Sequence, residues 1–493
     1  MKYLANLTAL WLITAMLLAC GGKTMPPPTV RATSTLAPTA TSRIPAPSPT
    51  ITPSATATPF VQIEAAALRG VRLRLWHAWR GETFEQLVAS FNAQNEYGIR
   101  VEAVYRGNYN DLYAQARAAL AGGELPEIAV AYPYEILAWQ EGGARLVNLT
   151  PYLDDPQWGS NATDFYLPFW QSKGARYDLA AQRTAQVLAY NLSWAHTLGF
   201  PHPPIKPQDF REQACAAGRA NANDADPTND GSGGWVASVT PTIMLSWIYA
   251  FEGEVVKSDG TGYRFDTPQS EAAFRFLASL KEEGCFWQPP GEGASDGFGE
   301  HTHAEAEFAA RRALFIALPL EDIPRLARAM ERAGNDDEWT VLAFPSNEQP
   351  VITTYGPSFT IFSSSAEKEL AAWVFLRWLL LPQNQARWIK AEGTFPLRST
   401  TMDYLNGYSK AHPQWLVAVA LLEGAQTEPR LPSWKVALGV WRRRNATVPL
   451  LLRRRPYSGD IGAFGRHRRG IESAGTVKFA FLQQPSRCSI VVI

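Results

Sequence analysis

Between residues 71 and 143 the chain alternates between two hydrophobic periods, and this alternation restricts the fold more than any other feature. Apolar and polar residues alternate over 71–75, as in a half-buried strand, and apolar residues then recur at helical spacing over 84–91. The same strand-then-helix pattern repeats over 99–123 and again over 127–143. This βαβαβα order predicts an α/β fold with a largely parallel sheet.

The loops that follow the three predicted strands all contain aromatic residues. They cover 76–81, 105–109 and 132–134. Ligands of open α/β sheets lie beyond the carboxyl ends of the strands, so these loops are the expected place for a site. Aromatic faces pack against the C–H faces of sugar rings, and the neighbouring polar groups bond hydroxyls. The alternative is that Trp76 and Tyr105 are buried beneath the edge of the sheet.

The amino terminus has the features of an export signal. Lys2 supplies a positive charge, 7–18 is apolar, and Ala19 is the small residue expected at a cleavage site. About twelve apolar residues are too few to span a bilayer. The segment resembles a bacterial lipoprotein signal peptide, which makes Cys20 the lipid attachment site and places the protein on the outer face of the cell membrane. The alternative is an ordinary secretory signal or a short membrane anchor.

Residues 21–60 are predicted to form a stalk. They are rich in Pro, Thr, Ser and Ala and contain few large apolar residues, so they cannot bury enough surface to offset the entropy of ordering. The remaining chain of about 430 residues is long for one core, which indicates two lobes or domains. No second stretch of about 20 apolar residues follows, so no further membrane span is expected.

Seven segments from 75 to 398 together resemble the extracellular solute-binding proteins of ABC importers, the family that includes sugar and glycerol-3-phosphate receptors. Each segment is weak alone, but their order along the chain makes the set specific. The segments are 75–79, 105–109, 122–126, 312–315, 355–358, 371–378 and 393–398.

The resemblance implies a periplasmic-binding-protein-like fold with two α/β lobes, a hinge and a ligand cleft between the lobes, in a protein that is a monomer. Closure around the ligand would be a hinge motion that ligand contacts with both lobes favour. The implied crossings between lobes lie near 186–191, 353–358 and 396–401. The implied boundaries are 61–187 and 356–400 for the first lobe, 188–355 and 401–441 for the second, and 442–493 for an atypical tail.

The resemblance also implies which side chains reach the cleft. Two alternatives stay open: Trp247 lies in a segment apolar enough to be a core helix, and Arg398 is equally suited to pairing with a carboxylate. Trp194, Trp235 and Trp434 are weaker candidates. The predicted ligand-binding residues are Trp79, Arg80, Tyr109, Tyr132, Trp247, Tyr355 and Arg398.

Sugars and phosphate esters are both compatible with these segments. The aromatic residues Tyr132 and Tyr134 stand about where the glycerol-phosphate receptors carry a carboxylate, which favours a sugar or oligosaccharide. A glycerol-3-phosphate or glycerophosphodiester ligand would instead need Arg80, Arg106 or Arg398 as a guanidinium partner. The expected partners are the sugar and the transmembrane subunits of an ABC permease.

Two other classes of protein share some of these features. A secreted glycosidase needs a pair of carboxyl groups across the sugar, and the aromatic loops have only Glu82 and Glu135 beside them. We therefore expect no enzymatic activity, no catalytic residues and no cofactor. A surface carbohydrate-binding protein that works without a transporter has the same cleft and stays open.

Three cysteines follow Cys20. Cys215 and Cys285 both fall in the second lobe, and an oxidising exterior favours a disulfide between them over two free thiols, leaving Cys488 unpaired. The loop 221–234 has oxygen ligands but not the spacing of an EF-hand, and His301 and His303 lack a third ligand. No metal site is therefore expected.

The charge is balanced overall but not along the chain. With 46 basic and 46 acidic residues, the composition gives no reason to expect a nucleic-acid partner. The segment 442–493 holds ten Arg and one Lys against Asp460 and Glu472, interrupted by Gly and Pro and without a helical stripe. We interpret it as the product of a shift in coding frame between about 434 and 444, or as a basic tail for anionic lipid headgroups.

Overall fold

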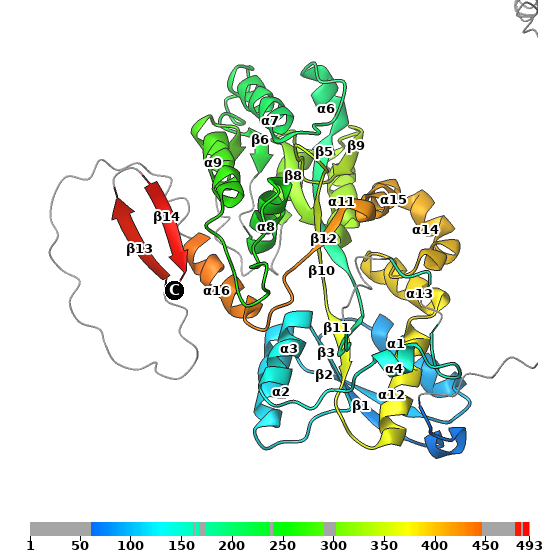
Figure 1. Cartoon of the computed structure of the whole chain (residues 1–493). Coiled ribbons are helices and arrows are strands. Elements are labelled where there is room, and N and C mark those ends of the chain that lie inside the picture. Colours follow the sequence, from blue (N-terminus) through cyan, green and yellow to red (C-terminus); the bar gives the residue numbers. More distant parts are fainter. Residues whose placement is uncertain are drawn as a thin grey trace, which may run out of the picture. The chain divides into compact units, whose positions relative to one another are not determined.

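The computed structural model describes residues 61–160, 163–166, 174–236, 240–289, 302–445, 479–484 and 487–492. The signal segment with Cys20, the stalk and His301 lie outside this part of the chain. Its strands form two large sheets, one in each of two lobes, and a separate two-stranded hairpin (Figure 1).

The alternating pattern at the start of the body forms the first lobe. The three predicted strand–helix units are confirmed, with bounds within about three residues of the prediction, and β1 pairs in parallel with both β2 and β3. The sheet order is β2-β1-β3-β11-β4, and β11 runs antiparallel to its neighbours. The elements are β1 (Arg72–His77), α1 (Thr83–Gln94), β2 (Arg100–Tyr105), α2 (Tyr109–Leu120), β3 (Ile128–Ala131), α3 (Pro133–Glu141), α4 (Thr150–Leu153), β4 (Leu179–Ala180), β11 (Ser358–Ile361), α12 (Ala366–Leu379) and α13 (Pro382–Glu392).

Helices cover both faces of the first sheet because successive strand residues point to opposite sides. Leu73 and Leu75 of β1 pack in one core with the apolar faces of α1 and α12. Trp76, the next residue of β1, packs in another core with α2 and α3. Trp76 is thus buried, and the guanidinium of Arg106 lies 4.2 Å from its ring centroid.

The second lobe is built on a sheet of order β12-β10-β5-β8-β6-β7, with β9 also paired to β5. Apolar residues of α7, α8 and α9 pack on one face, and those of α10 and α11 on the other. The strands are β5 (Thr184–Asn191), β6 (Gly233–Val236), β7 (Phe286–Trp287), β8 (Ala313–Pro319), β9 (Trp339–Leu342), β10 (Ile352–Tyr355) and β12 (Ala425–Thr427). The helices are α6 (Leu192–Thr197), α7 (Pro207–Ala222), α8 (Pro241–Ala250), α9 (Pro268–Glu282), α10 (Thr302–Ala309), α11 (Ile323–Ala333), α14 (Asn406–Ala411), α15 (Pro413–Ala420) and α16 (Trp434–Asn445).

The carboxyl-terminal segment differs from the sequence-based expectation. No helical stripe was expected there, yet α16 runs to Asn445 and includes the first arginine triplet, 442–444. Further along, β13 (Phe479–Gln484) and β14 (Arg487–Val492) form an antiparallel hairpin. The frame-shift hypothesis stays a prediction.

Three chain segments cross between the lobes, and Arg183 touches all of them. Its buried guanidinium donates to the carbonyl oxygens of Gln182 (2.7 Å), Gly356 (3.1 Å) and Pro357 (2.6 Å) and to the hydroxyl of Ser358 (2.9 Å). Its own carbonyl accepts the N–H of Phe395 (2.8 Å), in the third segment.

The position of the first crossing corrects the prediction. Strand β5 of the second sheet begins at Thr184, so the chain crosses at 181–183 rather than at 186–191. The second crossing lies at Gly356 and Pro357, within the predicted range. Gly356 is required there, because its φ is +144° and a Cβ would lie 2.5 Å from the carbonyl oxygen of Gln182.

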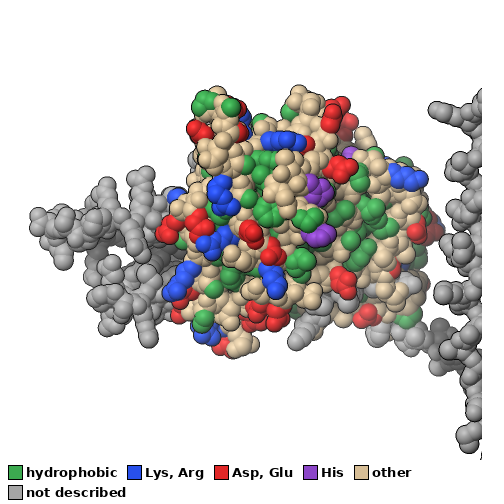
Figure 2. All heavy atoms as spheres, turned by 90° about the horizontal axis from the view of Figure 1, so that it is seen from above, with side chains coloured by type: hydrophobic (Ala, Val, Ile, Leu, Met, Phe, Trp, Pro, Cys, Tyr) green, Lys and Arg blue, Asp and Glu red, His purple; other side chains and the backbone are tan. Residues whose placement is uncertain are grey.

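Figure 2 views the body from above, over the second lobe. On this face basic and acidic side chains are interspersed rather than gathered by sign. Within the described ranges no helix has the length and apolar character needed to cross a membrane.

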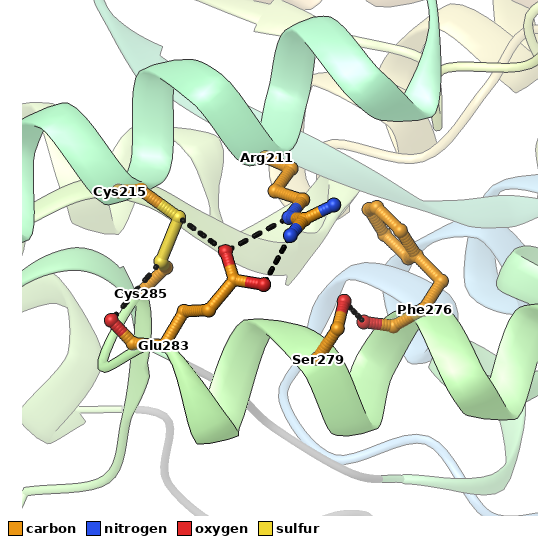
Figure 3. The surroundings of a disulfide bond; sticks show 6 residues. All are labelled: Arg211, Cys215, Phe276, Ser279, Glu283 and Cys285. Carbon is orange, nitrogen blue, oxygen red and sulfur yellow. Dashed lines mark hydrogen bonds and ion pairs between the residues drawn. A yellow bond between two sulfur atoms is a disulfide. The ribbon is translucent and has the colours of Figure 1, made fainter.

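A disulfide joins α7 to the segment after α9 (Figure 3). The sulfurs of Cys215 and Cys285 are bonded, with their Cα atoms 4.3 Å apart and a sequence separation of 70. Beside the bond, the guanidinium of Arg211 donates to the carboxylate of Glu283, with 2.9 Å between Nε and Oε2. Since the two sulfurs are bonded to each other, neither is available as a thiolate metal ligand.

Removing this cross-link is expected to destabilise the protein. The double variant Cys215→Ser/Cys285→Ser should lose about 4 kcal/mol of unfolding free energy, because the bond closes a loop of 70 residues and restricts the unfolded chain. Urea denaturation of the variant and the parent measures the difference. The parent treated with reductant is the matched control and should match the variant. Equal midpoints for variant and oxidised parent would contradict the prediction.

Candidate ligand-binding site

A cavity of about 230 Å³ lies between the two lobes. Both lobes contribute to its wall, the first through α2, α3 and the residues before them, the second through β5, β10, α8 and α16. It is lined by Tyr109, Asn110, Tyr132, Tyr134, Glu135, Gln186, Thr240, Pro241, Thr242, Tyr355, Glu428, Lys435, Leu438 and Gly439.

Three tyrosines form the first-lobe wall. Tyr132 follows β3 directly and precedes α3, so its ring stands at the carboxyl edge of the sheet. It stacks on Tyr134 with 5.4 Å between ring centroids, and Tyr109, the first residue of α2, meets it edge-on at 5.3 Å. The loops after the second and third strands therefore present continuous aromatic surface, as their composition predicted.

The second-lobe wall is set by strand register. Tyr355 ends β10, which runs antiparallel to β5, and Gln186 of β5 donates from Nε2 to the Tyr355 hydroxyl over 2.9 Å. The amino end of α8 adds Thr240, whose hydroxyl accepts the N–H of Ile243 at 3.4 Å, and Thr242. This wall offers an amide and hydroxyl groups beside one aromatic ring.

Glu428 brings a carboxyl group into the same wall. It follows β12, and its N–H donates to the carbonyl of Thr354 over 3.1 Å, which places it beside Tyr355. Burial raises the pKa of the Glu428 carboxyl to about 7, although hydrogen bonds from Thr242 and Trp434 and the charge of Arg183 lower it. Among the described residues Glu428 forms no ion pair.

Helix α16 closes the cavity on one side and contacts both lobes. Its first residue, Trp434, is fully buried in the second-lobe core. The Lys435 ammonium forms an ion pair with Glu135 of α3, donates to Oδ1 of Asn110 over 2.8 Å, and lies 4.4 Å from the ring centroid of Tyr113. Glu135, whose side chain is 1% exposed, also accepts the N–H of Tyr132 at 3.0 Å.

Of the seven predicted ligand-binding residues, the structure brings Tyr109, Tyr132 and Tyr355 to the cavity and leaves four elsewhere. Trp247 is a correction: it is fully buried inside the second lobe, with the rings of Phe210 and Phe276 at 5.2 and 5.1 Å. The core-helix alternative therefore describes it.

Trp79, Arg80 and Arg398 are engaged within the protein. Trp79 is buried in the core of the first lobe, and its indole N–H donates to Oε1 of Gln182 over 2.6 Å. Arg80 is exposed and donates to the Tyr105 hydroxyl over 3.2 Å. The Arg398 guanidinium pairs with Asp164, with 2.6 Å between Nη2 and Oδ1, so its carboxylate-pairing alternative holds in this structure.

The weaker candidates are also core residues. Trp194, Trp235 and Trp434 are at most 5% exposed and do not line the cavity. The sequence carried a usable signal for Tyr134, which lies in the same aromatic loop as Tyr132. It carried none for Glu428 or Lys435, which reach the site only through the packing of β12 and α16.

The chain belongs to the family of bacterial extracellular solute-binding proteins. The sequence profile of that family matches residues 86–412. The expected family and fold class are thus confirmed, and the family's location places the body outside the cytoplasm. The comparison with curated protein sequences finds no match.

Solved structures show the same fold at low sequence identity. The cyclic alpha-maltosyl-1,6-maltose binding protein of Arthrobacter globiformis aligns with a TM-score of 0.62 at 17% identity, over 78% of this chain and 95% of that one. The sugar-binding protein MalE of Xanthomonas citri gives 0.63 at 18%, over 77% and 92%. UgpB of Mycobacterium tuberculosis, in complex with glycerophosphocholine, gives 0.59 at 18%, over 76% and 91%.

The raised pKa of Glu428 predicts a pH-dependent stability. Between about pH 4.5 and 7 the unfolded chain releases this proton before the folded protein does, so the residue's contribution to folding falls as pH rises. The unfolding free energy of the variant Glu428→Gln, relative to that of the parent, should therefore be larger at about pH 8 than at about pH 5. Urea denaturation at both pH values measures this. Glu423→Gln, at an exposed site nearby, is the control; identical pH profiles for Glu428→Gln and the parent would refute the prediction.

Proposed function

We propose that this protein is the membrane-anchored receptor of an ABC importer, which captures a sugar or oligosaccharide between its lobes and delivers it to a permease. The observation that carries the proposal is the cavity whose wall combines four tyrosines with Gln186 and the threonines of α8, contributed by both lobes. Aromatic faces cover the apolar faces of a sugar ring, while amide and hydroxyl groups bond its hydroxyls. A ligand that contacts both lobes favours their closure.

The charges around the cavity favour a sugar over a phosphate ester. Among its lining residues Glu135 and Glu428 are acidic, and the single basic residue, Lys435, is already paired with Glu135. A phosphate group needs guanidinium or ammonium donors, yet Arg80 and Arg398 lie outside the lining and are engaged elsewhere. The complex of UgpB with glycerophosphocholine keeps a phosphodiester as the second candidate.

The proposal includes binding without catalysis. The family and the similar structures are solute-binding proteins. A surface carbohydrate-binding protein that works without a permease stays an alternative, and a solute-uptake assay distinguishes the two. If the protein is the receptor of an importer, deletion of its gene should abolish import of the bound solute; if it works without a permease, import should be unchanged.

Ligand binding should depend on the tyrosines from both lobes. We expect Tyr109→Ala and Tyr355→Ala each to weaken the best sugar ligand about tenfold or more, because each removes ring contact and, for Tyr355, the hydroxyl beside Gln186. A thermal-shift screen of mono-, di- and oligosaccharides with glycerol 3-phosphate and its diesters identifies the ligand, and calorimetry measures affinity. Tyr105→Ala is the matched control, since Tyr105 is 45% exposed and outside the cavity.

The screen also separates the candidates. Stabilisation by sugars alone supports the proposal, and ligand at about 100 times its dissociation constant should add about 2.7 kcal/mol to unfolding. Stabilisation only by phosphate esters would overturn the choice of ligand. Equal losses in Tyr105→Ala and Tyr355→Ala would remove the cavity from consideration as the binding site.

Anchoring rests on Cys20. In the proposed lipoprotein, acylation of Cys20 fixes the protein to the membrane and the stalk 21–60 holds the body away from it. Cys20→Ser should move the protein from the membrane fraction to the medium or the periplasm, measured by fractionation and immunoblotting. Cys488→Ser is the control and should remain in the membrane fraction. Retention of Cys20→Ser in the membrane would contradict the lipid anchor.

A further inference from the structure

We propose that the cavity selects a ligand bearing a protonated amine, namely an amino sugar or an oligosaccharide that contains one, with Glu428 as the partner of its ammonium group. The inference deepens the proposed function and rests on it. It follows from the charge balance of the cavity, its aromatic wall, and an ammonium group that the protein itself holds nearby.

The cavity carries one carboxyl group without a cationic partner. Lys435 pairs with Glu135, which leaves Glu428 without an ion pair among the residues that the structure describes. Arg183 is close enough to lower the Glu428 pKa, but its guanidinium donates to the backbone of the crossing segments and to Ser358. A partly buried carboxylate without a cation is unfavourable, so a cationic ligand group gains more here than in water.

Aromatic rings stand beside this carboxyl group. Glu428 adjoins Tyr355 across β10 and β12. The pKa of Tyr132 is raised first by burial, then by the neighbouring Tyr134 and Tyr109, and then by the charge of Glu428. Tyrosine faces attract ammonium groups, and the attraction is larger when water is excluded. The tyrosine rings and the Glu428 carboxylate therefore both favour a positively charged ligand group.

Lys435 shows the same chemistry within the protein. Its ammonium group contacts the carboxylate of Glu135, the aromatic ring of Tyr113 and the side-chain amide oxygen of Asn110. Glu428 with Tyr355 and Gln186 offers a comparable set on the opposite lobe, and no lysine or arginine side chain in the described part of the chain forms an ion pair with the Glu428 carboxyl group. The geometry thus points to an ammonium group supplied by the ligand.

The rest of the lining suits the sugar that would carry the amine. Thr240, Thr242 and Asn110 supply hydroxyl and amide groups, and Tyr132 with Tyr134 supplies stacked ring surface. A simple alkylamine would leave these groups unpaired, whereas a polyhydroxylated ring uses them.

The test compares three ligands of equal length and linkage that differ at one substituent: a glucosamine oligosaccharide, its N-acetylated form, and the corresponding cellodextrin. Calorimetry on the full chain in detergent at about pH 7 should show the amine binding at least about tenfold tighter than both neutral ligands, equivalent to about 1.4 kcal/mol. In Glu428→Gln this preference should fall to about twofold or less. Glu423→Gln, on the same segment but exposed and outside the cavity, should keep it.

A second measurement does not depend on a folded variant. If the ammonium group pairs with Glu428, binding to the parent should release protons when the pH is about one unit or more below the pKa of the ligand amine. The amine is then already protonated in solution, so only the Glu428 carboxyl group changes its charge on binding, and calorimetry in two buffers of different ionisation enthalpy measures the number of protons released. Glycerophosphocholine and glycerophosphoglycerol form a further matched pair, since both are phosphodiesters and only the first carries a quaternary ammonium.

The outcomes separate the two proposals. Neutral sugars that bind as tightly as the amine would overturn this inference and leave the sugar-receptor function in place. Failure of every sugar in the wider screen would overturn both. If glycerophosphocholine binds and no sugar does, the amino-sugar assignment would be overturned, and the partner of Glu428 would be the choline group of a phosphodiester. Retention of the amine preference in Glu428→Gln would remove Glu428 from the role proposed for it.

Discussion

The buried side chain of Arg183 is the interaction on which the arrangement of the two lobes depends. Its guanidinium holds the first and second crossing segments together through Gly356, Pro357 and Ser358, and its carbonyl holds the third through Phe395. Burial lowers the pKa of this arginine to about 10. This pKa is still well above neutral pH, so the guanidinium group stays charged. Bonds concentrated at one point leave rotation about that point as the natural relative motion of the lobes.

The cavity is built directly on this pivot. Tyr355 is the residue before Gly356, Gln186 lies on the strand that Arg183 leads into, and Glu428 is hydrogen-bonded to the same edge of the sheet. A change in lobe angle therefore moves Tyr109 and Tyr132 relative to this wall. The partly buried carboxyl group of Glu428 costs folding stability at neutral pH, and such a cost is commonly retained where a ligand uses the group.

Helix α16 gives the carboxyl-terminal part of the body a role at the site. Trp434 fixes the helix in the second lobe, and Lys435 reaches Glu135 in the first. The pairing joins the lobes, so it acts on the balance between open and closed forms as a ligand does. The segment 442–493, which the sequence analysis predicts to be atypical, thus begins within a helix that lines the cavity.

Sequence alone determined the strand–helix units of the first lobe and the aromatic loops at their carboxyl ends, because hydrophobic period and loop position are local properties. The sequence analysis also named Tyr109, Tyr132 and Tyr355, which the structure brings to the cavity. Only the tertiary structure decided that Trp247 faces the core, since an apolar helix has no sequence mark for the side that meets a cavity. Glu428 and Gln186 come together from segments over two hundred residues apart, and that proximity depends on sheet register rather than on local pattern.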